Sequence, residues 1–205
     1  MRIRIDLKIF IFLILFYFTN QLKIYLIVMF FCLIHEMAHM ILGIILKMKP
    51  NKLEINPFGF SISFEINNKD KSMKIKEVFV SLAGPVMSIV LAMQCQHINF
   101  RYIAIEEAIY SNILIFLFNM LPIYPLDGGR IIKGLLHIKI GENKAEKISN
   151  KISYITIILL TIFCSITVYY FQNFAIFLIC IFLWRIVLKE KKWQNTCYFV
   201  TKIVK

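Results

Sequence analysis

The chain has 205 residues, of which 59% are hydrophobic and 19 are Phe, and it carries a formal net charge of +12. Its mean hydropathy is +0.71. Long apolar runs at this frequency exclude a soluble globular domain and predict an integral membrane protein. The length suits one transmembrane domain, which we expect over residues 1–190, followed by a short basic cytoplasmic tail over residues 191–205.

Six apolar segments are candidates for membrane-spanning helices, each of which needs about 20 residues. Together they predict an all-α polytopic membrane protein with a short membrane-associated β-hairpin between the second and third helices. The segments are residues 9–20, 24–46, 78–95, 103–121, 152–171 and 174–188. The first and the last are short for a span.

The positive charge follows the expected orientation of these spans. If the N-terminus is cytoplasmic, 22 of the 24 Lys and Arg residues fall in cytoplasmic segments, and only Lys23 and Arg101 lie outside. This asymmetry is a topology signal, and it argues against a nucleic-acid partner. We expect a bacterial cell-membrane protein with both termini in the cytoplasm.

Two histidines and a glutamate interrupt the second apolar segment. His35 and His39 are four residues apart, so they share one helix face, and Glu36 occupies the position of the base in a zinc-protease helix. Ionisable side chains in a bilayer core cost about 3 kcal/mol each and usually line a cavity, so they call for a functional explanation. Catalytic zinc takes three protein ligands, and a third must therefore come from elsewhere.

Residues 52–66 have the period of a half-buried strand. Hydrophobic residues at every second position from Phe58 to Ile66 alternate with small or polar ones, and Asn56-Pro57 interrupts the pattern. We expect a hairpin that lies at the cytoplasmic interface or folds into the protein. Its edge could pair with an extended substrate, or the hairpin could serve only as a structural cap.

The best candidate for the third ligand is Asp127, which follows the fourth span. That span runs toward the cytoplasm in the predicted topology, so its end returns to the membrane half that holds His35 and His39. Pro122 and Pro125 break the helix, and the two glycines after Asp127 permit a tight turn. Irregular backbone at this depth is tolerated where it lines a cavity.

Three further segments are assigned structural roles. Gly84 and Pro85 in the third span predict close helix packing and a kink, without a catalytic role. Residues 131–140 predict an amphipathic surface helix, and residues 144–151 predict a basic, solvated connector into the fifth span.

Four motifs, in this order, resemble the site-2 protease family of intramembrane metalloproteases (M50). They are His35 to His39, Asn56-Pro57-Phe58-Gly59, Ser81 to Pro85 and Asn119 to Arg130. The six-span plan is most similar to the stage IV sporulation protein FB group. The resemblance implies one zinc ion per chain, bound by His35, His39 and Asp127, with Glu36 as the catalytic acid and base. Contacts to the substrate or to its oxyanion are expected from Asn119, Asn56, Pro57, Phe58 and Gly59, although an interhelical hydrogen bond is the alternative for Asn119.

The resemblance also implies what the protein acts on. A peptide bond of a membrane-associated protein would be hydrolysed within or near the cytoplasmic half of the bilayer, in regulated proteolysis. The resemblance suggests an inactive sigma-factor precursor as the substrate, with an anti-sigma factor or a remnant peptide as alternatives, and regulatory membrane subunits as partners. Many such proteases continue into a nucleotide-sensing CBS domain, for which residues 189–205 are too few, so control through such a domain is not expected.

Two other functions are open at this point. A membrane zincin of the prenyl-protein endopeptidase type would use a downstream glutamate, such as Glu142 or Glu146, as the third ligand. A non-catalytic zinc-binding membrane protein would use the histidine pair without hydrolysis. Replacing each acid and measuring bound zinc distinguishes the first alternative from a site-2 protease. Replacing Glu36 and measuring cleavage distinguishes the second, because only a protease would lose cleavage while zinc stays bound.

Overall fold

The computed structural model describes residues 2–56, 59–64, 71–96, 105–171, 181, 183–185 and 187–188. The chain falls into two compact units, Met1–Met120 and Leu121–Lys205. Most of the described residues are helical, as the sequence predicts. Much of the predicted sixth span and the whole of the predicted tail lie outside the described residues.

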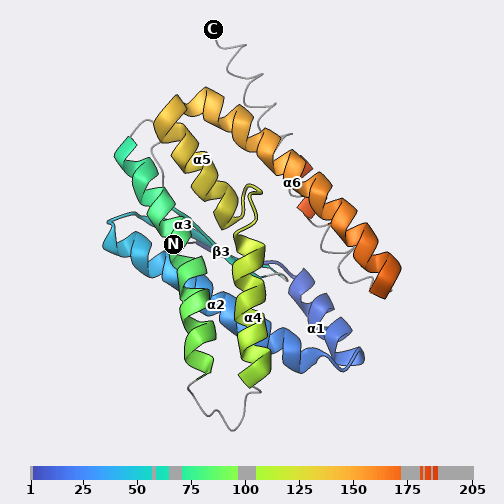
Figure 1. The fold of residues 1–205 in the computed structure, drawn as a ribbon. Coiled ribbons are helices and arrows are strands. Elements are labelled where there is room, and N and C mark those ends of the chain that lie inside the picture. Colours follow the sequence, from blue (N-terminus) through green and yellow to red (C-terminus); the bar gives the residue numbers. More distant parts are fainter. Residues whose placement is uncertain are drawn as a thin grey trace. The chain divides into compact units, whose positions relative to one another are not determined.

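Among its described residues, the first unit contains four helices (Figure 1). They are α1 (Lys8–Phe18), α2 (Leu22–Ile45), α3 (Lys71–Cys95) and α4 (Ile105–Asn119). They coincide with the first four predicted spans, except that α3 begins well before residue 78. Helices α2, α3 and α4 pack around a shared apolar core that includes Phe31, Cys95, Ala108 and Ile115. Large apolar side chains such as Leu26, Ile89 and Leu117 are exposed on these helices, a pattern that suits contact with lipid.

The first unit also contains a three-stranded sheet in the order β1-β2-β3. Its strands are β1 (Arg2–Ile5), β2 (Pro50–Asn56) and β3 (Gly59–Phe64). Strands β2 and β3 pair antiparallel at the position of the predicted hairpin, whereas β1 joins β2 in parallel. No local signal in the sequence predicts β1, because this strand has four residues and its partner lies beyond two helices.

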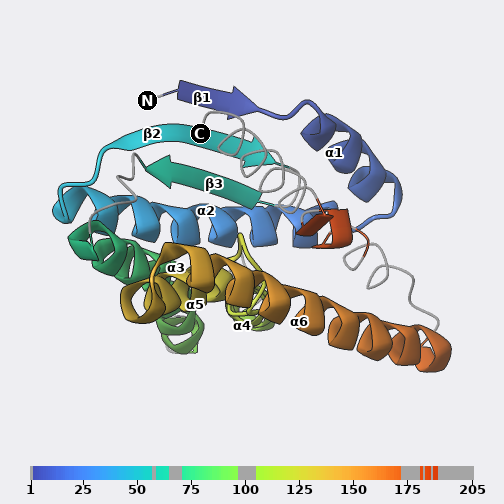
Figure 2. The same cartoon turned by 90° about the horizontal axis from the view of Figure 1, so that it is seen from above.

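Strand β3 runs along α2, as Figure 2 shows. At one end, Gly59 lies against the side chain of Cys32, and at the other the ring of Phe64 lies so close to Gly43 that a Cβ there would overlap it. Cys32 and Gly43 are about 16 Å apart along a helix that rises 1.5 Å per residue. The hairpin therefore lies beside the middle of an apolar helix, and its location in a membrane stays a prediction.

The second unit contains a pair of helices that pack on each other, α5 (Asp127–Ile140) and α6 (Glu142–Phe171). They are joined by Gly141, whose φ of +81° is one that glycine adopts without strain. The predicted amphipathic helix is part of α5, but the predicted connector over residues 144–151 is wrong, because it forms the first turns of α6. Ala145 and Ser149 from these turns are buried, which explains why the segment is helical.

Three described helices are long and apolar enough to cross a membrane. They cover Leu22–Ile45, Ser72–Cys95 and Glu142–Thr167, with Ile9–Phe18 as a shorter apolar helix. Helix α4 has 15 residues, which is short for a perpendicular span. The count of six spans stays a prediction.

Candidate metal centre

The two histidines of the HExxH motif lie side by side on α2. Both side chains are buried, and the Nε2 atoms of His35 and His39 are 3.2 Å apart. Their rings are nearly perpendicular, with an interplanar angle of 80°. The one-turn spacing that the sequence predicts therefore brings two ring nitrogens together in the interior of the first unit.

The opposite ring nitrogens contact helix α3. The Nδ1 atom of His39 lies 2.6 Å from the backbone carbonyl oxygen of Val80, which can only accept a hydrogen bond. His39 must therefore donate from Nδ1, which leaves a lone pair on Nε2. The Nδ1 atom of His35 lies 2.9 Å from Ser88 Oγ. Metal-binding histidines commonly have such partners on the second nitrogen, and the partners orient the ring.

The separation of the Nε2 atoms fits a shared metal ion. Zinc binds imidazole nitrogen at about 2.0–2.1 Å, and a tetrahedral angle then places the two nitrogens about 3.3 Å apart. The observed 3.2 Å agrees with this value. When Nδ1 of each neutral imidazole donates to its partner on α3, both Nε2 lone pairs are available to a cation between them. The donor set therefore fits zinc.

Gly84 in α3 provides the room that these nitrogens occupy. A Cβ atom at this position would overlap the Nε2 atoms of both His35 and His39. The neighbouring Pro85 is fully buried, and because it has no N–H it cannot donate to the carbonyl of Ser81 in the preceding turn. Sequence reasoning assigned Gly84 to helix packing alone. Its spacing from Ser81 and Ser88, at i−3 and i+4, is the signal that a small, polar face of α3 meets the histidines.

Glu36 lies between the histidine face and the sheet. Its carboxylate is buried, and Oε1 accepts a hydrogen bond from the backbone N–H of Ile62 in β3. The sequence predicts Glu36 as the base, but it carries no signal for this contact. The Glu36 carboxylate and strand β3 are therefore directly joined within the first unit.

Asp127 is the first residue of α5 in the second unit, and it is buried. The preceding loop folds over the first turn of the helix, where Leu126 N–H donates to the Ile123 carbonyl at 2.8 Å. A Cβ atom at Gly129 would overlap the backbone of Ile123 and Tyr124, so this packing requires glycine. The loop around Asp127 is thus set by local turn chemistry.

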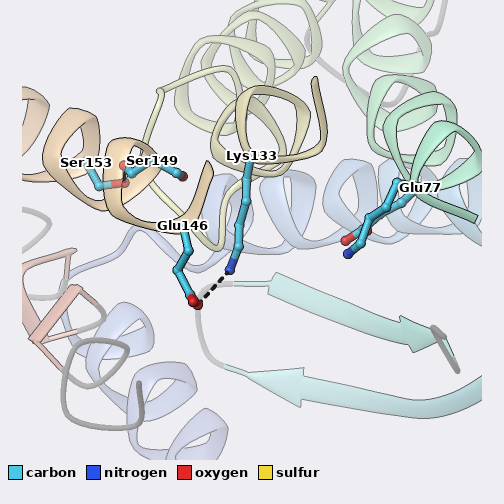
Figure 3. A network of polar contacts seen from close by, with 6 residues as sticks. Glu77, Lys133, Glu146, Ser149 and Ser153 are labelled. Atoms are coloured by element: carbon cyan, nitrogen blue, oxygen red, sulfur yellow. Dashed lines mark hydrogen bonds and ion pairs between the residues drawn. The ribbon is translucent and has the colours of Figure 1, made fainter. Parts of the chain in front are cut away.

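Side chains of α5 and α6 hold this loop in place. The Ser153 hydroxyl accepts a hydrogen bond from Tyr124 N–H at 3.1 Å and donates to the Ser149 carbonyl at 3.0 Å. Lys133 Nζ lies 3.7 Å from Glu146 Oε1 (Figure 3). The same atom lies 4.2 Å from the centroid of the Tyr124 ring. The segment before Asp127 is therefore anchored by both helices of its unit.

The alternative third ligands are placed differently from Asp127. Glu142 is exposed at the start of α6, and Glu146 is partly exposed and paired with Lys133. Neither carboxylate has the burial of Asp127, which is 5% exposed. Burial therefore favours Asp127 over both alternatives.

The structure describes three of the five residues that we expect to contact the substrate. Asn119 is the last residue of α4, and its Nδ2 donates to the Ile115 carbonyl of the same helix at 3.0 Å. Asn56 ends β2, and Gly59 begins β3 with a φ of +137°, which favours glycine. Pro57 and Phe58 lie outside the described residues.

Comparisons with known proteins find relatives in the family that the motifs resemble. Residues 97–160 match the model described as Peptidase family M50. Stage IV sporulation protein FB of Bacillus subtilis is 29% identical over 140 residues, which are 66% of this chain and 48% of that protein. A zinc metalloprotease of Methanocaldococcus jannaschii is 29% identical over 126 residues, 58% of this chain and 36% of that protein. The chain thus spans about half, or less, of the length of these curated relatives.

A solved structure has the same fold. The site-2 protease from Methanocaldococcus jannaschii matches with a TM-score of 0.69 and 21% identity over 92% of this chain and 89% of that chain. The resemblance to the site-2 protease family is confirmed by these matches together. The expected zinc cofactor and metallopeptidase class agree with what the relatives are described to be.

Proposed function

Since the chain is homologous to the site-2 proteases of peptidase family M50, we propose that it is an intramembrane zinc metalloendopeptidase. The observation that carries this proposal is the histidine pair on α2, with Nε2 atoms 3.2 Å apart and both Nδ1 atoms in contact with α3. A pair of this geometry suits a shared metal ion. The pair lies within one of three described helices that are long and apolar enough to cross a membrane, which suits an integral membrane protein.

The zinc ligands that we propose are His35, His39 and Asp127, with one ion per chain. All three side chains are buried, and two imidazoles with one carboxylate form a common ligand set of catalytic zinc. Zinc in such a site would supply Lewis acidity toward the scissile carbonyl and toward a water molecule. Val80 and Ser88 would keep the two imidazoles oriented.

Glu36 is the proposed general base and general acid. Its carboxylate is one residue from His35 and on the side of α2 that meets the hairpin. It would take a proton from the attacking water and pass it to the nitrogen of the leaving amine. Both transfers need the carboxylate to approach water and substrate in turn.

The substrate would bind in extended form along the outer edge of β3. A peptide bond inside a helix is sterically closed to attack, whereas a strand added to a sheet edge is held open. Asn56 to Gly59, which connect β2 and β3, and Asn119 at the end of α4 are the further residues that we propose for substrate contacts. For Asn119 this requires that its amide leave the Ile115 carbonyl or act through its oxygen.

The substrate class that we propose is a membrane-associated protein, cleaved in the cytoplasmic half of a bacterial cell membrane. The similarity to a sporulation protein makes an inactive sigma-factor precursor the first candidate, and an anti-sigma factor is the second. Regulatory membrane subunits would control access. The charge asymmetry supports cytoplasmic termini.

The test uses Glu36→Gln and His35→Ala in the full chain. Each variant is co-expressed with an epitope-tagged sigma-factor precursor or anti-sigma factor, and zinc is measured in the purified protein. We expect Glu36→Gln to keep its zinc and to slow cleavage by about a hundredfold or more, and His35→Ala to lose both zinc and cleavage. Unchanged cleavage in Glu36→Gln would reject Glu36 as the base, and zinc-free wild-type protein would reject the metal centre.

A further inference from the structure

The general base and the sheet edge share one hydrogen bond. Oε1 of Glu36 accepts from the N–H of Ile62, and both residues are buried. The contact is flanked along α2 by Cys32 against Gly59 and by Gly43 against Phe64. Strand β3 is therefore held against α2 on both sides of the point where the carboxylate meets the strand.

The Ile62 N–H points away from the hairpin. In the antiparallel register, Ile62 is opposite Leu53, between the pairs Ser61 with Glu54 and Ser63 with Lys52. Backbone groups of successive strand residues point to opposite edges. Because Ile62 donates to Glu36 and β3 is the last strand of the sheet, the backbone groups of Phe60, Ile62 and Phe64 form the outer edge.

An added strand would need the same N–H. A peptide that pairs with β3 forms hydrogen bonds with every second residue of this strand, namely with the residues of the outer edge, and Ile62 is the middle one. One backbone N–H makes one good hydrogen bond, so a substrate carbonyl and the Glu36 carboxylate compete for it. While Ile62 holds the carboxylate, one of its oxygens is directed at the backbone and away from water.

We propose that Ile62 restrains Glu36 in the free enzyme and that a substrate strand releases the carboxylate by taking this hydrogen bond. Pairing at β3 then prepares the base at the moment when an extended peptide is in place. Peptides too short to pair would leave Glu36 restrained and would be cleaved slowly. The protein would thus select substrates by strand pairing as well as by side chains, an inference that rests on the proposed function.

Ile62→Pro tests this coupling, because proline removes the outer N–H without removing a hydrogen bond to β2. Ile62→Val keeps the N–H and is the reference for the change in side chain. Ser61→Pro, which removes an N–H that faces β2, is the control for a broken hairpin. The zinc-loaded full-length proteins are assayed in detergent with a blocked dipeptide amide and with an unstructured decapeptide.

We expect Ile62→Pro to cleave the dipeptide about tenfold faster than Ile62→Val, with the gain in kcat and not in KM, because a hydrogen bond to a charged group no longer holds Glu36. Cleavage of the decapeptide should change much less, so selectivity for it falls about tenfold. Ser61→Pro should slow both. Equal loss of both activities in Ile62→Pro, or unchanged selectivity, overturns the inference while the proposed function stands.

A second measurement does not depend on cleavage. The Ile62 amide is assigned in isotope-labelled protein by its disappearance in Ile62→Val, and its hydrogen exchange is compared between wild type and Glu36→Ala. We expect faster exchange at Ile62 in Glu36→Ala, with Phe60 and Phe64 unchanged. Equal exchange at Ile62 overturns the inference. If the wild type cleaves neither peptide, the proposed function fails and the inference fails with it.

Discussion

The histidine pair and the Asp127 loop are held by contacts of different range. His35 and His39 depend on Val80 and Ser88, which are more than forty residues away along the chain. Asp127 follows a loop that is held by its own helix and by the next one. Orientation of the imidazoles is thus a product of packing between α2 and α3, whereas presentation of the carboxylate is a product of local turn chemistry.

The largest effect is expected from Asp127→Asn. Loss of the anionic ligand should remove zinc from the purified protein, a greater effect than the roughly 10- to 100-fold loss of affinity that outer partners cause. Glu146→Gln should retain zinc, since Glu146 pairs with Lys133. Metal analysis of both variants decides the matter, and zinc kept by Asp127→Asn but lost by Glu146→Gln would move the third ligand to α6.

The two glycines provide the next comparison. Gly129→Ala meets backbone that cannot move aside, and we expect it to lower the free energy of unfolding by about 1–3 kcal/mol. Gly84→Ala meets two imidazole rings that can rotate away, so it should cost less stability but abolish zinc binding. Thermal unfolding in detergent and metal analysis measure the two effects. A Gly84→Ala variant with full zinc would show that the rings do not need this space.

Ser88→Ala should weaken zinc binding about 10- to 100-fold without loss of fold, because it removes the partner of His35 Nδ1. Ser111→Ala is the matched control, since the Ser111 hydroxyl bonds only the Glu107 carbonyl of its own helix among the contacts recorded for the described residues. Competition with a zinc chelator gives both affinities. Equal affinities would mean that α3 does not orient His35.

The smallest effect is expected from Lys133→Met. Lys133 is partly exposed, and its ion pair with Glu146 and its contact with the Tyr124 ring should together stabilise the second unit by about 1 kcal/mol. The midpoint of thermal unfolding should fall slightly, with no change in zinc content. A larger fall than that of Gly129→Ala would contradict the view that the loop is held mainly by its backbone packing.

Local patterns explain what could be predicted from the sequence. The spacing of His35 and His39 is a helical period, so their shared face follows directly. The prolines before Asp127, the glycines after it and the distribution of Lys and Arg together predict its position. In the structure Asp127 is buried at the start of α5. The alternation over residues 52–66 predicted the β2–β3 pair for the same reason.

The features that could not be predicted from the sequence depend on contacts between residues far apart in the chain. Nothing near Ser88 in the sequence indicates that its hydroxyl meets His35, and nothing near Ile62 indicates that its N–H meets Glu36. The basic character of residues 144–151 predicts a connector, but two small side chains on one face, Ala145 and Ser149, are buried, and the segment is part of α6. A basic segment can be either a solvated connector or the exposed face of a helix, and the burial of its small side chains determines which of the two it forms.

The parallel pairing of β1 with β2 has a consequence for biogenesis. Strand β1 precedes α1 in the chain, and its partner β2 is synthesised only after α1 and α2. The pair can form only if the chain before α1 and the chain after α2 end on the same side of the membrane. Completion of the sheet therefore requires α1 and α2 to run as an antiparallel pair: insertion of only one of the two helices would leave β2 without β1 as its neighbour.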